Sequence, residues 1–177
     1  MQLDMMFTGF GGQGILMMGK IVALAALKKD KEVAWIPSYG PEMRGGTAYC
    51  TVVISDESIG SPVIQNPQYL VAMNQPSMEK FAKDVKTNGM ILKNTSLVPV
   101  NSDRPDIIEH KIAANEIANE LGSVKVANMV ALGAFIAKTQ MFSFDLIETI
   151  LSQELSKKPA LIDININAIA RGRECVN

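Results

Sequence analysis

The chain has 177 residues, of which 47% are hydrophobic and 20% are charged, and its formal net charge is −1. This length suits one domain with a sizeable core, and the charge balance lacks the basic footprint of a nucleic-acid-binding protein. Without a long apolar run or a secretory signal, we expect a cytoplasmic protein that binds neither nucleic acid nor a membrane. The two cysteines, Cys50 and Cys175, are too far apart for zinc or iron–sulfur spacing, so free thiols are expected.

The first distinctive stretch is glycine-rich and runs Gly9-Phe10-Gly11-Gly12-Gln13-Gly14. It follows an apolar run, residues 1–7, that we expect to form a strand, and it precedes an apolar run of helical length, residues 15–27. This order aims the backbone N–H groups of a helix N-terminus at an anion. The spacing is one residue shorter than the Gly-x-Gly-x-x-Gly of dinucleotide-binding proteins. Two interpretations stay open: a ligand site, or a tight turn that lets the helix pack on the sheet.

A second distinctive stretch, residues 37–46, combines prolines and glycines with Ser38, Tyr39, Glu42 and Arg44. It follows a short strand expected over residues 32–36. A helix connects this strand to the first one, so we expect the two strands to be parallel and both loops to emerge at the same edge of the sheet. The density of special residues favours a functional loop that closes over the glycine loop, and the alternative is a solvated surface loop.

The remaining chain alternates between strand and helix patterns. We expect strands at residues 47–55, 69–73 and 90–93, an edge strand at 106–109, and helices at 78–85, 111–121, 126–138, 144–155 and 159–171, with Gly172 ending the last helix. This alternation predicts an α/β fold: a three-layer α/β/α single domain over residues 1–177, with a mainly parallel, mixed central sheet of the Rossmann-like kind.

Polar residues stand at two further element boundaries. Asn74 and Gln75 follow a buried strand, where open α/β sheets place their sites, although plain helix capping by Asn74 or Ser77 explains this cluster equally well. Asn128 stands near the start of a helix that is apolar on nearly every side, and such a helix is buried in a core or an interface. We therefore expect self-association, for example a homodimer. The sequence shows no catalytic set, and we assign no catalytic residue and no metal ligand.

Four motifs in this order resemble the gamma subunit of 2-oxoacid:ferredoxin oxidoreductases, and they span residues 9–14, 38–47, 73–77 and 127–133. Their wording is closer to the 2-oxoglutarate and branched-chain 2-oxoacid (ketoisovalerate) branch than to the pyruvate branch. The resemblance implies a subunit, inactive alone, of an enzyme that converts a 2-oxoacid to an acyl-CoA, carbon dioxide and reduced ferredoxin. It also implies that cofactor-binding residues lie in the motifs, namely Gly9, Gly11, Gly12, Gln13, Gly14, Ser38, Tyr39, Glu42, Arg44, Gly45, Gly46, Asn74, Gln75 and Asn128.

The resemblance further implies a hetero-oligomer. Alpha and beta subunits would frame thiamine diphosphate and Mg²⁺, a ferredoxin-like delta subunit or domain would carry iron–sulfur clusters, and ferredoxin would accept the electrons. This chain lacks a thiamine–magnesium motif and has too few cysteines for a cubane cluster. We therefore expect it to bind none of these cofactors alone, with coenzyme A as a co-substrate that the glycine loops contact, unless these loops only dock the alpha subunit.

Two other functions remain open from the sequence. The chain could be a stand-alone nucleotide- or CoA-binding module, or a non-catalytic packing subunit whose glycine loops serve only subunit contacts. No acidic residue ends the second strand, where Trp35, Ile36 and Pro37 stand, and this argues against a dinucleotide-binding module. The sequence does not separate the enzyme subunit from the packing subunit.

Overall fold

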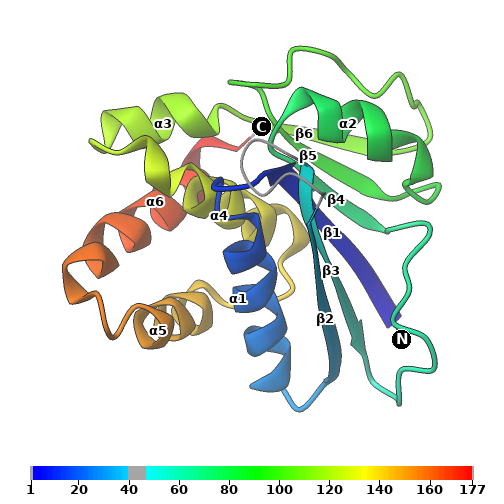
Figure 1. Ribbon diagram of the computed structural model, residues 1–177, viewed down its shortest axis with the longest axis horizontal. Helices are drawn as coiled ribbons and strands as arrows, with labels where there is room; N and C mark the ends of the chain where they lie inside the picture. The colour runs from blue at the N-terminus through cyan, green and yellow to red at the C-terminus, as the bar shows by residue number, and fades with distance from the viewer. Residues whose placement is uncertain (1, 40–46, 177) are drawn as a thin grey trace.

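A six-stranded mixed sheet forms the centre of the molecule in the computed structural model, which describes residues 2–39 and 47–176 (Figure 1). The strand order is β2-β3-β1-β4-β5-β6, with the bounds β1 Gln2–Phe10, β2 Glu32–Tyr39, β3 Thr47–Ser55, β4 Tyr69–Ala72, β5 Met90–Asn94 and β6 Ile108–Ile112. β1, β4, β5 and β6 pair in parallel, and β3 is antiparallel to both of its neighbours, β1 and β2. The prediction of a mainly parallel, mixed sheet is confirmed.

Helices cover the two faces of the sheet unequally. One face carries α1 (Ile15–Leu27), α3 (Ala114–Glu120), α4 (Ala127–Thr139), α5 (Phe144–Glu154) and α6 (Ile162–Cys175), and the other carries α2 (Gln75–Phe81) (Figure 1). Short 3₁₀ turns lie at Ala82–Asp84, Val124–Val126 and Pro159–Leu161. The three-layer α/β/α architecture is therefore confirmed, with a thin second helical layer.

Side chains of the strands alternate between two hydrophobic clusters, as the period of two in a strand requires. In β1, Met5 and Phe7 belong to the larger cluster beneath α1 and α4, whereas Met6 belongs to the smaller cluster beneath α2. Phe7 meets Phe135 of α4 edge to face, with ring centroids 5.3 Å apart. The core is thus split by the sheet, with its larger part on the side of α1 and α4.

β1 and β2 run in the same direction, as predicted, but they are not neighbours because β3 lies between them. β2 and β3 form an antiparallel hairpin, and its strand ends sit beside the end of β1: Phe10 pairs with Thr47, and Tyr39 pairs with Ala48. The expectation that the loops after β1 and β2 emerge at one edge therefore holds at the level of the strand ends.

α4 is buried within the chain itself. Its residues 127–136 are all buried, and α6, α3, α1 and β5 pack around it. The all-round apolar helix is thus explained by the core, and it gives no reason to expect self-association.

Several predicted boundaries shift in the structure. β1 and β2 each end three residues later than predicted, at Phe10 and Tyr39, so the first residues of both predicted loops belong to strands. The edge strand β6 starts two residues and ends three residues later than predicted, and it takes Lys111 and Ile112 from the expected helix, so α3 begins at Ala114. α2 begins at Gln75, earlier than expected, because Asn74 caps it. α6 continues to Cys175, so the prediction that Gly172 ends this helix is wrong.

Candidate functional site at the carboxyl edge of the sheet

The glycine loop leaves β1 through a tight turn that is held from within. The backbone N–H of Gln13 donates to the Phe10 carbonyl at 3.1 Å, and the Phe10 N–H donates to the Gln13 side-chain oxygen Oε1 at 2.7 Å. Gly12 supplies the positive φ of +94° at the third position of this turn. Gln13 is therefore committed to shaping the loop.

Gly14 is the N-cap of α1 and adopts the left-handed conformation, with φ 72° and ψ 21°. A glycine has no side chain to accept hydrogen bonds from the first turn, and the first turn of α1 contains no acidic residue. Nothing on α1 itself therefore offsets the positive end of this 13-residue helix, which is where an anion binds most readily.

Asn128, at the start of α4, packs directly against this N-cap. Its amide nitrogen Nδ2 donates to the Gly14 carbonyl at 3.2 Å, and a Cβ on Gly14 would lie 2.2 Å from that nitrogen. The side chain is 6% exposed, and its oxygen Oδ1 has no hydrogen-bond partner among the described residues. The structure thus brings together Gly14 and Asn128, two predicted site residues that are far apart in the sequence.

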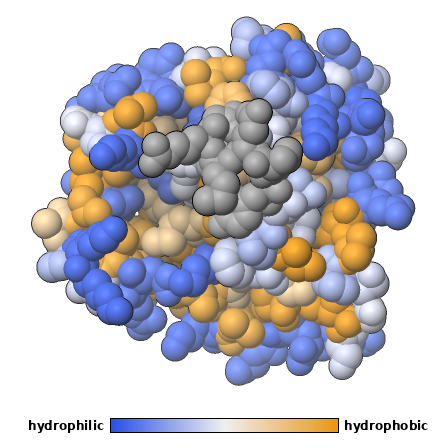
Figure 2. Space-filling view, viewed as in Figure 1, coloured by the Kyte–Doolittle hydropathy of each residue, from blue (hydrophilic) through white to orange (hydrophobic). Residues whose placement is uncertain are grey.

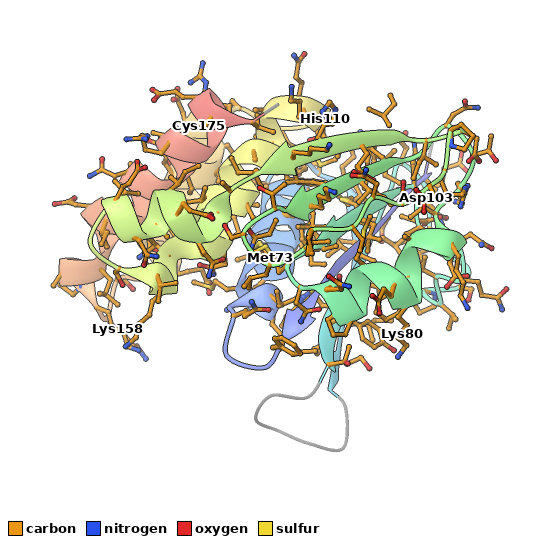
Figure 3. All side chains as sticks on the ribbon, turned by 90° about the horizontal axis from the view of Figure 1, so that it is seen from above. Met73, Lys80, Asp103, His110, Lys158 and Cys175 are labelled. Carbon is orange, nitrogen blue, oxygen red and sulfur yellow. The ribbon has the colours of Figure 1, made fainter. Side chains whose placement is uncertain are left out.

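Asn74 and Gln75 play different roles at the end of β4. Asn74 is 1% exposed and caps α2, with its Oδ1 accepting from the Ser77 N–H at 2.9 Å. The Asn74 Nδ2 and the Ser77 Oγ have no partner among the described residues. Gln75 instead faces outward and donates to Glu79 at 2.7 Å. Figure 3 looks down on this edge, with Met73, the residue after β4, near the middle of the view. The capping interpretation is confirmed for Asn74.

Sequence reasoning missed two buried polar residues at the end of β5. Asn94 is 1% exposed, donates to the Asn115 oxygen at 2.8 Å and accepts from the Ala114 N–H at 3.0 Å, which fixes the start of α3. Lys93 is 2% exposed, and its Nζ donates to Val100 O at 2.6 Å and Asn101 Oδ1 at 2.7 Å. A Lys-Asn pair at the end of an apolar run was the only signal in the sequence.

The second predicted loop is represented by its flanks alone. Ser38 pairs with Tyr49 across the β2–β3 hairpin, and Tyr39 pairs with Ala48. Glu42, Arg44, Gly45 and Gly46 lie outside the described residues. Their predicted roles stay predictions.

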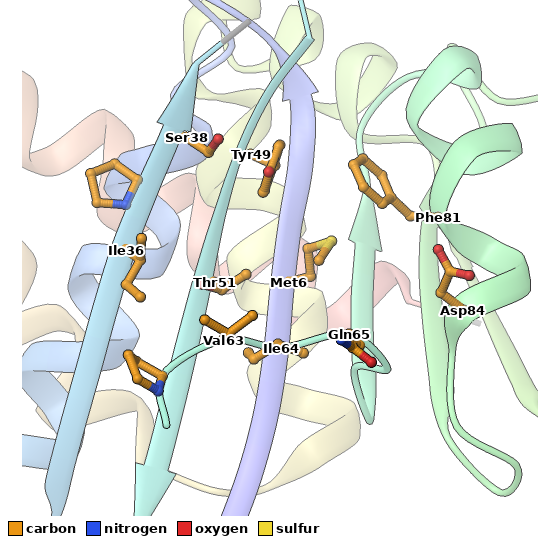
Figure 4. A pocket seen from close by; sticks show the side chains of 12 residues that line it. Met6, Ile36, Ser38, Tyr49, Thr51, Val63, Ile64, Gln65, Phe81 and Asp84 are labelled. Carbon is orange, nitrogen blue, oxygen red and sulfur yellow. The ribbon is translucent and has the colours of Figure 1, made fainter. Parts of the chain in front are cut away.

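Ser38 lines a pocket of about 370 Å³ on the face of the sheet that α2 leaves open (Figure 4). Met6, Thr51 and Tyr49 rise from the strands as its floor, Phe81 and Asp84 stand on the side of α2, and the segment 62–65 crosses it. None of the residues 9–14 lines this pocket. The pocket and the glycine loop are therefore separate features.

Titratable chemistry near these features is sparse. Burial raises the pKa of the Cys50 thiol to about 12, so this thiol stays protonated and inert. Over the described ranges 2–39 and 47–176, no three His, Cys, Asp or Glu side chains are grouped to hold a metal ion. The described residues at the carboxyl edge offer backbone N–H groups and side-chain amides, which can bind and position a group.

The visible surface gives no further pointer to a partner. In Figure 2, hydrophobic and hydrophilic residues are interspersed over the coloured part of this face. No helix among the described residues is long and apolar enough to cross a membrane.

A family model, described as pyruvate ferredoxin/flavodoxin oxidoreductase, matches residues 4–175. The chain is 36% identical over 177 residues to the 2-oxoglutarate synthase subunit KorC of Methanocaldococcus jannaschii, covering 98% of this chain and 94% of that protein. It is also 39% identical over 168 residues to the ketoisovalerate oxidoreductase subunit VorA of Methanothermobacter marburgensis. That match covers 94% of this chain and spans 35% of the length of VorA. The chain belongs to the pyruvate ferredoxin/flavodoxin oxidoreductase family.

Solved structures agree with this assignment. The gamma subunit of a keto/oxoacid ferredoxin oxidoreductase from Geobacter sulfurreducens superposes with a TM-score of 0.81 at 32% identity, covering 97% of this chain and 96% of that one. The 2-oxoglutarate:ferredoxin oxidoreductase of Magnetococcus marinus, solved with 2-oxoglutarate, coenzyme A and succinyl-CoA bound, shares the fold with a TM-score of 0.88 at 24% identity. The match covers 98% of this chain and 30% of that longer protein. The resemblance to gamma subunits in the sequence is therefore confirmed.

Proposed function

We propose that residues 1–177 form a single gamma-type domain that acts as the gamma subunit of a cytoplasmic, thiamine diphosphate-dependent 2-oxoacid:ferredoxin oxidoreductase. The reaction is the oxidative decarboxylation of 2-oxoglutarate or a branched-chain 2-oxoacid, with coenzyme A as the co-substrate. Support comes from the KorC and VorA relatives, whose names specify these two substrates. The arrangement of the described residues supports it as well, because two of the family motifs meet at the N-terminus of α1.

The observation that carries this proposal is the meeting of Asn128 with Gly14 at the N-terminus of α1. Two of the four family motifs converge there, on a helix end that suits an anion. Coenzyme A fits this edge, because its phosphates match the free N–H groups of the first turn. Gly12, Gly14 and Asn128 would lie against it, and coenzyme A supplies the thiol that accepts the acyl group.

The thiamine and electron-transfer chemistry belongs to partners in this proposal. Thiamine diphosphate and Mg²⁺ sit between alpha and beta subunits, and iron–sulfur clusters sit on a ferredoxin-like delta subunit or domain that passes electrons to ferredoxin. With two cysteines in the whole chain, Cys50 and Cys175, this subunit cannot supply the four thiolates of a cubane cluster.

Purification from the native host through a tag on this chain tests the proposal. We expect partner subunits to co-purify with bound iron and thiamine diphosphate, and the complex to reduce ferredoxin with 2-oxoglutarate or 2-oxoisovalerate and coenzyme A. The chain purified alone should contain neither iron nor thiamine and show no turnover. Stoichiometric iron or turnover in the isolated chain would overturn the proposal.

Replacing Arg44 distinguishes two possible roles of the second loop, binding of coenzyme A and docking to the alpha subunit. Its planar guanidinium suits a phosphate or a carboxylate. If Arg44 binds coenzyme A, Arg44→Ala should cost about 1.5–3 kcal/mol of binding free energy, so the complex needs a higher coenzyme A concentration. Assembly of the complex should stay intact. If Arg44 docks the alpha subunit, the same change weakens assembly and leaves the coenzyme A requirement of the remaining complex unchanged. If Arg44→Ala changes neither the coenzyme A requirement nor assembly, the second loop serves only packing.

A further inference from the structure

The strand β6 forms one edge of the sheet, and its outer side carries backbone groups that β5 does not use. The Ile108 N–H donates to, and the Ile112 carbonyl accepts from, residues that flank β5, each at 2.9 Å. Because the hydrogen-bonding direction alternates along a strand, the N–H and C=O groups of Glu109 and Lys111 point away from β5. Among the described residues, no strand lies beyond β6 and no loop backbone takes up these groups. In Figure 3 the labelled His110 marks β6 near the margin of the molecule.

The two edges of the sheet differ in how they are protected. The edge strand β2 contains Pro37, which lacks an N–H and hinders pairing with a further strand. β6 contains no proline and carries two charges on one face, Glu109 and Lys111. Lys111 is exposed, its ladder neighbour on β5 is the cation Lys93, and it forms no salt bridge among the described residues. This lysine therefore lacks a counter-charge within the described chain.

Charges on an edge strand usually keep two sheets apart, but the charge order of β6 complements itself. In antiparallel pairing of two copies about a two-fold axis, an axis at Glu109 sets two carboxylates opposite each other. An axis at Lys111 does the same with two ammonium groups, and like charges in opposite positions are destabilising. An axis at His110 instead places each Glu109 opposite Lys111 of the second copy, which is favourable. The sequence of β6 thus selects one register.

We propose that two copies of this chain dimerise by pairing their β6 strands antiparallel about an axis at His110, which joins the two six-stranded sheets into one. Each Glu109–Lys111 pair exchanges both of its backbone hydrogen bonds. On the other face Ile108, which is 57% exposed, comes opposite Ile112 of the second copy. Strands of five residues bury less than the roughly 1,200 Å² of a stable interface, so the dimer is weak. The inference does not rest on the proposed function.

Sedimentation equilibrium of the full chain, from about 10 µM to about 1 mM, tests the self-association. We expect a reversible equilibrium between monomer and dimer in this range. Lys111→Glu replaces both attractive pairs by repulsive ones and should weaken dimerisation at least about tenfold. Lys29→Glu is the matched control, because it makes the same charge change at an exposed lysine just before β2, at the opposite edge of the sheet. It should leave the dimer unchanged.

Lys111→Pro tests the backbone pairing directly. Proline removes an N–H that points out of the sheet, so the strand keeps its hydrogen bonds to β5 while the ladder to the second copy is broken. This variant should be monomeric up to about 1 mM. Thermal unfolding shows whether the variant is folded, and the charge variants and the cysteine variants below decide the question if it is not.

Disulfide formation tests the register in a Cys175→Ser background, where the remaining thiol, Cys50, is fully buried. At the axis the two Cα atoms of a non-hydrogen-bonded pair lie about 4.5 Å apart, a distance that a disulfide bridges. His110→Cys should therefore give a cross-linked dimer under mild oxidation. Ile108→Cys is the control on the same face of β6. It should stay unlinked, because an axis at His110 holds the two positions about 14 Å apart.

A chain that sediments as a monomer over the whole range would overturn the inference, and this measurement needs no variant to fold. A dimer that Lys111→Glu and Lys29→Glu weaken equally would overturn it too, since association would then follow net charge and not β6. Faster cross-linking of Ile108→Cys than of His110→Cys would exclude the axis at His110 and with it the proposal. None of these results touches the co-purification and turnover that test the proposed function.

Discussion

The Nζ of Lys93 lies 3.2 Å from Glu109 Oε1, although the Lys93 side chain is only 2% exposed. The three donors of this ammonium are all used, because Val100 O and Asn101 Oδ1 accept the other two. Glu109 in turn accepts from the Ser102 N–H at 2.8 Å. One buried ion pair thus ties β5 and the edge strand β6 to the segment that follows β5.

We expect Glu109→Gln to lower the free energy of unfolding by about 1.5–3 kcal/mol, the range for a hydrogen bond to a charged group. The loss arises because Lys93 stays buried without its counter-charge. Urea unfolding measures it. The double variant Lys93→Met with Glu109→Gln should recover part of the loss, since it removes the buried charge. A double variant less stable than Glu109→Gln would contradict this account.

The same pair predicts a dependence of stability on pH. Burial opposes ionisation of Glu109, but hydrogen bonds from Ser102 and Lys93 outweigh it and lower the pKa of this carboxyl. A lowered folded-state pKa stabilises the protein fully above the unfolded-state value of about 4.3, and the contribution is lost as the pH falls through the folded-state pKa. The stability difference between the unchanged chain and Glu109→Gln should shrink below about pH 4. A constant difference from pH 7 to pH 3 would show that Glu109 does not stabilise through its charge.

Local patterns in the sequence were enough to predict α1, β3 and the alternating α/β order. α1 and β3 have the predicted bounds, because each is a long, uniform run of helix- or strand-favouring residues. The position of β3 between β1 and β2 was not predictable, since it depends on pairing between distant strands. The start of α3 was missed because residues 111–112 fit a helical stripe but pair with β5 in the sheet. In both cases the outcome depends on pairing between strands that are distant in the sequence, which local patterns do not show.

The candidate site was predictable in its residues but not in its contacts. The motifs indicated both Gly14 and Asn128, yet no local signal shows that residues 114 positions apart share a hydrogen bond. The Lys93–Glu109 pair was missed for a similar reason: a lysine at the end of an apolar strand is usually solvated, and the loop that buries it has no periodicity.

Three glycine substitutions distinguish the stability cost of an unfavourable backbone conformation from the cost of a steric contact with Asn128. Gly14→Ala combines a φ of +72° with a Cβ 2.2 Å from the Asn128 Nδ2, and we expect a loss of at least about 2 kcal/mol. Gly12→Ala meets no atom within 4 Å but has a φ of +94°, so about 1–2 kcal/mol is expected. Gly60→Ala meets neither condition and should change stability by less than about 0.5 kcal/mol. Equal effects of Gly14→Ala and Gly12→Ala in thermal unfolding would show that the Asn128 contact adds nothing.

The two cysteines should differ in reactivity. Cys50 is fully buried, its Sγ lies 3.7 Å from the Ile15 carbonyl oxygen, and its pKa is raised to about 12 by burial. Cys175 is half-buried near the end of α6. Because the thiolate is the reactive form, a thiol reagent at pH 8 should label Cys175 first, and Cys50 only when the protein opens. Mass spectrometry over time gives the order, with Cys175→Ser as the control. Rapid labelling of Cys50 in the folded Cys175→Ser variant would contradict the burial of this thiol.

The last prediction concerns the contact between α4 and α6, where a glycine of each helix lies against the backbone of the other helix. A Cβ on Gly172 would lie 1.9 Å from the Val130 carbonyl oxygen, and a Cβ on Gly133 would lie 2.0 Å from that of Ile169. Both glycines are inside helices, where alanine is normally the better residue by about 1 kcal/mol. Because the two helices approach closely, glycine is favoured over alanine at both positions. This explains why a glycine stands at position 172 inside α6.

We expect Gly172→Ala and Gly133→Ala each to destabilise the chain by about 2–3 kcal/mol, because backbone atoms cannot yield as a flexible side chain can. The double variant should cost less than the sum of the two, since the first alanine already separates the helices and makes room for the second. Urea unfolding of the four proteins measures this coupling, and Gly60→Ala controls for a general effect of replacing glycine. If either single variant is more stable than the unchanged chain, helix propensity outweighs packing and the two helices are not in close contact at these glycines.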